Sequence, residues 1–169
     1  MNKEIIIFSI KTSVVHFLSY SLVGAIAYQL FTKQFYVGET PVFTMFMRSE
    51  SNPDQWRHVM NWIFPGQILR GLLIGLALYA FLPVLKEMGR GRRITAMAFL
   101  IYVSTSLAAA APSPSNIEGL IYLRPELVGL KPFLLTQPEM IVYSFVFAIG
   151  VSLIVEGKVK LPRKKISSE

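Results

Sequence analysis

Four long apolar runs dominate this chain and restrict what it can fold into. They are Ile5–Phe31, Ile68–Leu85, Ile94–Ala111 and Met140–Val155. A helix needs about 20 apolar residues to cross a hydrocarbon layer about 30 Å thick, and each run is close to that length. The sequence therefore predicts an all-α integral membrane protein with four transmembrane helices. We place these spans at approximately residues 5–31, 66–86, 94–111 and 138–155.

Composition supports one membrane domain over residues 1–169, and the last part of it, residues 156–169, is a basic tail. Hydrophobic residues make up 53% of the chain and charged residues 16%, below the roughly 25% typical of soluble domains. The chain has no cysteine, which excludes a disulfide, a thiolate metal site and a cysteine nucleophile.

Positive charges are divided unequally between the two sides of the predicted bundle. If both termini share one side, that side holds eleven of the seventeen Lys and Arg residues and only four acidic residues. The eleven are Lys3, Lys11, Lys86, Arg90, Arg92, Arg93, Lys158, Lys160, Arg163, Lys164 and Lys165. Because cytoplasmic loops are enriched in Lys and Arg, we expect a multi-pass cell membrane protein with both termini in the cytoplasm. This basic rim should contact anionic lipid head groups, not nucleic acid.

A rival interpretation treats the first run as a secretory signal, since Ala25-Ile26-Ala27 has the form of a cleavage site. The run is about twice the length of a signal's apolar region, and it contains Lys11 and His16. These features favour a retained transmembrane helix.

An amphipathic helix is predicted between the first and second spans. Asn52-Pro53-Asp54-Gln55 is typical of a helix start. Apolar side chains then recur at helical spacing, at Trp56, Val59, Met60, Ile63 and Phe64. We expect this helix to lie flat on the external interface and to turn sharply at Phe64-Pro65-Gly66 into the second span.

Three local patterns predict helix ends and helix packing. Thr136-Gln137-Pro138-Glu139 has the form of a capping box, so the fourth span is expected to begin there, with Glu139 as a capping residue. Ser115 to Glu118 has the same spacing in the third loop and predicts a short helix or turn. Gly71 and Gly75 form a G-x-x-x-G, which favours close approach of another helix.

The first span carries the most polar face of the predicted bundle. His16 and Tyr20 share it with Thr12 and Ser19, so these side chains should point between helices. An intramembrane histidine acts in some proteins as a proton carrier or ligand anchor. We favour a neutral His16 that hydrogen-bonds to a neighbouring helix.

Arg70 is the strongest candidate for ligand binding, because a guanidinium inside a span needs a carboxylate, an anion or the head groups. We expect it to pair with Glu118 or Glu139, or to hold an acidic ligand or a lipid in an external-facing pocket. The tentative ligand-binding residues are Arg70, Gln67, His58, Glu118 and Arg124.

No motif for catalysis, metal binding or a cofactor occurs in the sequence. The sequence therefore favours a non-enzymatic subunit or accessory protein, with a protein partner or a second copy bound through small-residue helix faces. The alternative is binding or transport of a lipid or small acidic ligand around Arg70. An enzyme acting on lipids at the outer interface, with His58 or Glu118 as base, is the weakest hypothesis.

Overall fold

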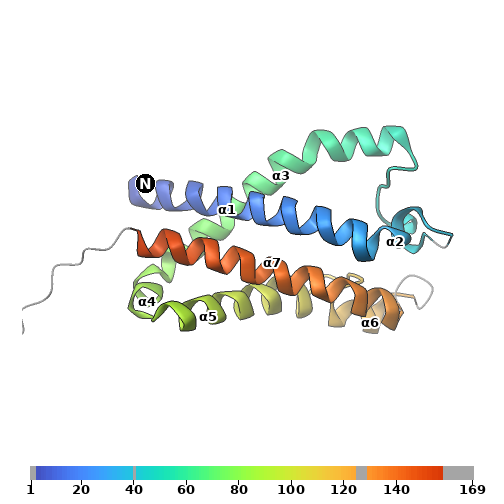
Figure 1. The fold of residues 1–169 in the computed structure, drawn as a ribbon. Coiled ribbons are helices and arrows are strands. Elements are labelled where there is room, and N and C mark those ends of the chain that lie inside the picture. Colours follow the sequence, from blue (N-terminus) through green and yellow to red (C-terminus); the bar gives the residue numbers. More distant parts are fainter. Residues whose placement is uncertain (1–2, 40, 125–128, 158–169) are drawn as a thin grey trace, which may run out of the picture.

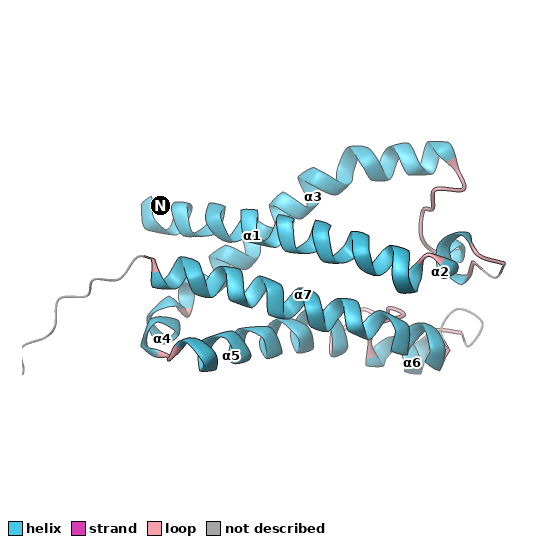
Figure 2. Ribbon diagram, viewed as in Figure 1, coloured by secondary structure: helices cyan, strands magenta, loops and turns pink. Residues whose placement is uncertain are grey.

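The computed structural model describes residues 3–39, 41–124 and 129–157, and within them it contains helices and connecting turns but no strand (Figures 1 and 2). The elements are α1 (Lys3–Ala27), the π-helix η1 (Tyr28–Thr32), α2 (Gln34–Val37), the 3-10 helix η2 (Val42–Met45), α3 (Pro53–Ala80), α4 (Leu82–Glu87), α5 (Arg90–Tyr102), the π-helix η3 (Val103–Leu107), α6 (Ile117–Tyr122) and α7 (Leu130–Glu156). The predicted all-α class is confirmed. The predicted basic tail lies outside the described residues from 158 onward.

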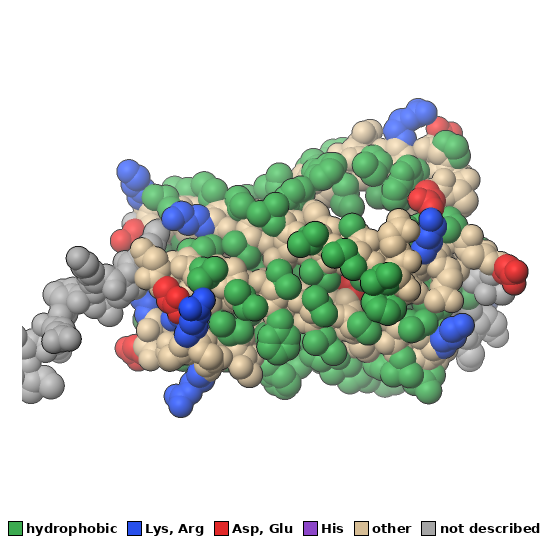
Figure 3. Space-filling model, in the orientation of Figure 1, with side chains coloured by type: hydrophobic (Ala, Val, Ile, Leu, Met, Phe, Trp, Pro, Cys, Tyr) green, Lys and Arg blue, Asp and Glu red, His purple; other side chains and the backbone are tan. Residues whose placement is uncertain are grey.

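Three helical segments are long and apolar enough to cross a membrane, namely Lys3–Thr32, Pro53–Ala80 and Leu130–Glu156. The first and the third of them contain the first and fourth predicted spans, and Pro53–Ala80 contains most of the second, which was expected to continue to residue 86. Figure 3 shows charged side chains gathered at the two ends of the bundle, with a broad apolar band between them. We call the end with Thr32, Pro53 and Leu130 the loop end, and the opposite end the terminal end.

The helices are arranged so that α1 packs between α3 and α7, while α7 packs between α1 and α5 (Figure 1). The core lies among α1, α5 and α7, where Phe8, Met97, Phe147 and Val151 are almost fully buried. Most other large apolar side chains of these helices are exposed, as expected where lipid replaces water as the surrounding medium.

Close packing of α1 against α3 depends on the predicted G-x-x-x-G. A Cβ atom added at Gly71 would lie 2.6 Å from the Cα of Ser13, and one added at Gly75 would lie 2.6 Å from the Cα of Ser9. The two backbones thus approach as closely as glycine allows. The Ser13 hydroxyl also donates to the Ile68 carbonyl at 2.8 Å. The predicted packing role of these glycines is confirmed.

The second predicted span differs from the structure at both ends. Asn52 caps α3 as predicted, since its side chain accepts from the N–H groups of Asp54 and Gln55. The predicted sharp corner after Phe64 is wrong, because α3 runs without interruption from Pro53 to Ala80 with Pro65 inside it. The segment predicted to be interfacial is therefore the first half of α3 and not a separate helix.

The helix of the fourth predicted span begins earlier than the sequence pattern indicates. α7 starts at Leu130, so Pro138 and Glu139 lie in its interior and the predicted capping box is wrong. Thr136 instead donates from its hydroxyl to the Phe133 carbonyl at 2.9 Å, one turn earlier in the same helix. Glu139 is left without the capping role that the sequence pattern gave it.

The helix of the third predicted span lies four residues closer to the N-terminus than expected. α5 and η3 together cover Arg90–Leu107, and the helix has ended before Ala111. In η3, Ser104 and Thr105 donate to the carbonyls of Leu100 and Ile101, so their hydroxyls are satisfied within the apolar band.

The short helix predicted in the third loop is present as α6, but its cap is Asn116 and not Ser115. The Asn116 side chain accepts from the N–H of Gly119 at 2.8 Å and donates to the Ala109 and Ala111 carbonyls. Gln137 of α7 also donates to the Ser115 carbonyl at 3.0 Å. These bonds hold α6 against the ends of η3 and α7.

Arg93, which the charge pattern assigns to the basic rim, is buried at the terminal end of the bundle. Its Nε donates to the Ser152 hydroxyl at 2.8 Å, and its Nη2 lies 2.5 Å from Glu156 Oε1. Its Nη1 donates to the Leu85 carbonyl at 3.1 Å. One side chain thus ties α4, α5 and α7 together.

Candidate functional site

A cavity of about 1050 Å³ separates α1 from the first half of α3. It lies toward the loop end, where α3 leaves α1 and its axis changes direction (Figure 1). Residues 44–50 of the connection close one side, and α7 contributes Glu139. In Figure 3 the surface is hollowed between these two helices, and apolar side chains rim the hollow.

The cavity is lined by the apolar face that the sequence predicts at the start of α3. Trp56, Val59, Met60, Ile63 and Phe64 all line it. The periodicity is therefore predicted correctly, but this face is turned toward α1 and does not simply rest on the lipid interface.

Two local features leave open space between α1 and the first half of α3 at the level of the cavity. Pro65 cannot donate a backbone hydrogen bond within α3, and such a position bends a helix. On the opposite wall, α1 presents Gly24 and Ala25, whose side chains are too small to fill the space. The result is a wide separation a few turns from the tight contact at Gly71 and Gly75.

Aromatic rings form the part of the cavity wall nearest the loop end. The ring centroids of Tyr28 and Tyr36 are 5.5 Å apart, and those of Tyr36 and Phe43 are 5.2 Å apart. Phe35 and Phe43 are buried and anchor this part of the connection. Burial raises the pKa of Tyr36 to about 12, and the nearby Glu139 carboxylate acts in the same direction. Tyr36 is therefore a neutral hydrogen-bond donor at physiological pH.

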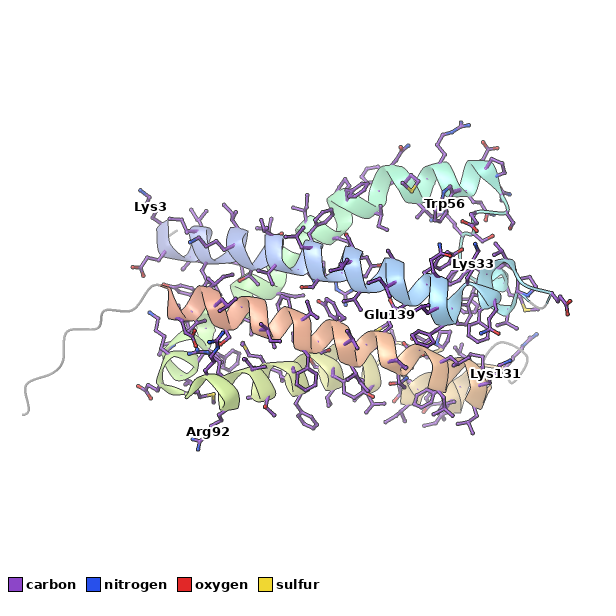
Figure 4. All side chains as sticks on the ribbon, in the orientation of Figure 1. Lys3, Lys33, Trp56, Arg92, Lys131 and Glu139 are labelled. Atoms are coloured by element: carbon purple, nitrogen blue, oxygen red, sulfur yellow. The ribbon has the colours of Figure 1, made fainter. Side chains whose placement is uncertain are left out.

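Glu139 is the carboxylate that reaches the cavity from within the bundle (Figure 4). It is largely enclosed, and no hydrogen bond or ion pair to it occurs within residues 3–39, 41–124 and 129–157. Its charge acts on Tyr20 and Tyr36, which also line the cavity. A Cβ atom added at Gly24 would lie 3.6 Å from Glu139 Oε1, so this carboxylate faces the bare stretch of α1.

His16 lies below the cavity and connects three helices. Its Nδ1 is 2.6 Å from the Tyr143 hydroxyl, and its Nε2 is 3.0 Å from Gln67 Oε1. Because an amide oxygen only accepts, Nε2 carries the proton and Nδ1 accepts from Tyr143. His16 is fully buried, with both nitrogens satisfied in the neutral form. This geometry is that of a structural link, the role favoured from the sequence.

Arg70 does not reach the cavity. Its side chain is exposed, and it makes no ion pair within the described parts of the chain. It lies one helical turn beyond Gln67 on α3 and is outside the cavity lining. The pairing expected with Glu118 or Glu139 is absent, so that expectation is wrong.

The other tentative ligand-binding residues are not brought together either. Gln67 lines the cavity and binds His16, whereas His58 is exposed and its ring lies tilted against that of Trp62, with centroids 6.4 Å apart. Glu118 is on α6, and Arg124 is exposed just beyond it. None of His58, Glu118 and Arg124 lines the cavity.

The apolar side of the cavity, on α3, is predicted from the sequence, whereas the side with Glu139, Tyr28 and Tyr36 is not. Glu139 was assigned to a helix cap, and Tyr28 and Tyr36 were not singled out. A usable signal was present, because Glu139 is an acidic residue beside a proline at the edge of an apolar run, and such a charge needs a reason. Among the described residues, no three His, Asp or Glu side chains are grouped as metal ligands.

Comparison of the chain with protein families, with curated proteins and with solved structures finds no match. Function is therefore argued from the site alone.

Proposed function

We propose that this chain is a non-enzymatic membrane protein that holds an amphipathic small molecule or a lipid in the cavity between α1 and α3. The observation that carries the proposal is the cavity itself. Small-molecule sites in proteins are mostly apolar hollows of about 300–1,000 Å³ with a few placed polar groups. The hollow of about 1050 Å³ beside Glu139 has that size and that character.

Access from the bilayer follows from the exposed faces on either side of the opening. Along α1 the side chains of Leu18, Leu22 and Ile26 are exposed, and along α3 so are Met60 and Phe64. An apolar molecule dissolved in the bilayer would pass between these helices without crossing water. This route favours amphipathic ligands over small hydrophilic ones.

We further propose four spans in a cell membrane, with both termini in the cytoplasm. α5 and η3 cover 18 residues, Arg90–Leu107, and at about 1.5 Å per residue they would extend about 27 Å. That length is close to the hydrocarbon thickness of about 30 Å, and this segment runs alongside α7 (Figure 1). The excess of Lys and Arg at the terminal end supports the orientation.

Single cysteines test this topology directly, because the chain has none of its own. Ser51→Cys should react with a membrane-impermeant thiol reagent added to intact cells. Gly89→Cys, in the exposed turn between α4 and α5, should react only after the cells are opened. Labelling of Gly89→Cys in intact cells, with Ser51→Cys protected, would reverse the proposed orientation.

Native mass spectrometry of gently solubilised protein tests the ligand proposal. The wild-type protein should carry a non-protein mass that Gly24→Leu loses, because the leucine side chain would occupy the part of the cavity next to Glu139. Gly66→Leu is the matched control, since a Cβ added at Gly66 meets nothing within 4 Å. The control should retain the bound mass. Equal bound mass on all three proteins would contradict the proposal.

A role as an accessory subunit, expected first from the sequence, remains a second proposal. Its support is now the exposed apolar side of α5, with Phe99 and Leu100 pointing outward. The small residues that favoured a partner are occupied within the chain, since Gly71, Gly75 and Gly150 contact Ser13, Ser9 and Val15. A stoichiometric protein partner in the same native spectra would favour this second proposal.

A further inference from the structure

We infer that the ligand of this cavity is a monovalent organic cation with an apolar body, held with its positive charge against Glu139 and its body among the rings of Tyr20, Tyr28 and Tyr36. This inference rests on the proposed function and names the ligand class of the same site. It replaces the acidic ligand that Arg70 suggested.

The first support is the uncompensated carboxylate. Glu139 lies on the cavity wall, and no Lys, Arg or His in the described parts of the chain forms an ion pair with it. An anion in an enclosed, mostly apolar site costs free energy unless a counter-charge or several donors satisfy it. A cationic ligand supplies that counter-charge, whereas an anionic ligand would add a second negative charge at the same place.

The second support is the aromatic lining beside that carboxylate. Tyr20, Tyr28 and Tyr36 line the same cavity as Glu139. The faces of aromatic rings attract cations, and ring-lined sites recognise quaternary ammonium groups. Phe17 and Trp56 also line the cavity and extend this aromatic surface around the apolar body.

The remaining charges of the lining agree with this assignment. Glu50 lines the cavity beside Tyr28, so the loop end carries a second carboxylate. Arg48 is the basic residue of the lining, and like Glu50 its side chain is exposed. Arg70 is outside the lining. Glu139 is therefore the acidic group of the enclosed part of the cavity, and no basic residue of the lining accompanies it there.

Two probes of the same size and shape but opposite charge test the inference. They are tetraphenylphosphonium, a cation, and tetraphenylborate, an anion. Binding is read from Trp56 fluorescence in a Trp62→Phe background, in micelles of an uncharged sugar detergent. Trp56 lines the cavity and Trp62 does not, so a Trp56→Phe protein with Trp62 retained is the control for signal from outside the cavity.

Tetraphenylphosphonium should bind saturably and at least about tenfold more tightly than tetraphenylborate, because like charges in an enclosed site repel. Glu139→Gln should weaken binding of the cation by about tenfold and reduce the preference between the probes. Glu139→Asp keeps the charge and should retain most of the preference. An unchanged affinity for the cation in Glu139→Gln would overturn the inference.

The tyrosines are tested by separating ring from hydroxyl. Tyr36→Phe keeps the aromatic face and should bind the cation within about twofold of wild type, while Tyr36→Leu should bind it several-fold more weakly. Equal affinity in the phenylalanine and leucine variants would exclude a role for the ring.

A free cation is also distinguished from the head group of a zwitterionic lipid. Dodecyltrimethylammonium should displace tetraphenylphosphonium, whereas dodecylphosphocholine should displace it poorly, because its phosphate would come close to Glu139 and Glu50. Equal displacement by both would overturn the assignment to a free cation.

Failure of this inference differs from failure of the proposed function. If both probes bind equally and Gly24→Leu abolishes both, the cavity binds ligands but does not select cations. If neither probe binds in a way that Gly24→Leu abolishes, the proposed function itself is contradicted.

Discussion

Replacing Arg93 with glutamine should lower the free energy of unfolding by about 3 kcal/mol, because it removes one partner of a buried ion pair. The side chain is 4% exposed, and its guanidinium contacts Glu156, Ser152 and the Leu85 carbonyl. Glutamine cannot reach all three, so α4, α5 and α7 lose their common link. Reversible unfolding in mixed micelles with increasing SDS, followed by tryptophan fluorescence, measures the change.

Arg92 is the matched control for this substitution. It is the preceding residue of α5, it carries the same charge, and its side chain is exposed and directed away from the bundle (Figure 4). Arg92→Gln should change the unfolding free energy by less than about 0.5 kcal/mol. Adding Glu156→Gln to Arg93→Gln should recover little of the loss, because Glu156 is 37% exposed and still has Arg90 at 3.7 Å when Arg93 is replaced. Equal destabilisation by Arg92→Gln and Arg93→Gln would show that only net charge matters.

Gly75→Ala should lower the free energy of unfolding by about 2 kcal/mol, although alanine is the better helix former. The added Cβ would lie 2.6 Å from the Cα of Ser9, so α1 and α3 must move apart. Because the obstructing atom belongs to the backbone, Ser9→Gly should not rescue the variant. The same SDS unfolding assay applies.

Gly66→Ala is not expected to lower the free energy of unfolding as Gly75→Ala does. A Cβ at Gly66 meets nothing within 4 Å, so only the helix-propensity gain of up to about 1 kcal/mol remains. Gly66→Ala should therefore leave stability unchanged or raise it. Destabilisation of similar size at Gly66 and Gly75 would contradict the close approach of α1 and α3.

The parts of the fold that could be predicted are those encoded by local spacing. The apolar recurrence from Trp56 to Phe64 predicts one face of a helix, and that face lines the cavity. Gly71 and Gly75 predict a close helix contact, which α1 provides. Asn52 predicts the start of α3. Each pattern extends over only a few residues, and periodicity alone decides which side chains share a face.

The parts that could not be predicted depend on contacts between distant segments. The spacing from Thr136 to Glu139 fits a helix cap, but α7 begins about two turns before Glu139, at Leu130. Gln137, inside α7, donates to the carbonyl of Ser115 in the preceding loop. Glu139 therefore lies in a cavity wall and not at the helix end that the sequence pattern predicts. No local pattern could reveal that displacement.

The charge pattern of the sequence also does not distinguish basic residues that are buried from those that are exposed. Arg93 lies in a basic stretch, yet its partners come from α4 and α7. Arg70 lies inside a predicted span, where a carboxylate partner is expected. Glu118 does not provide it, because Asn116 holds α6 at the end of η3, away from α3. Burial and pairing of a charge are properties of the assembled bundle.

The most direct test of the central claim is a cryo-EM map of the protein in lipid nanodiscs, with a bound antibody fragment to increase its size. The map should show the first half of α3, before Gly71, separated from α1, and elongated non-protein density that begins between Ala25 and Met60 and ends at Glu139. The contradicting result is a map in which the first half of α3 packs directly on α1, with Met60 touching Ala25 and no density between the two helices.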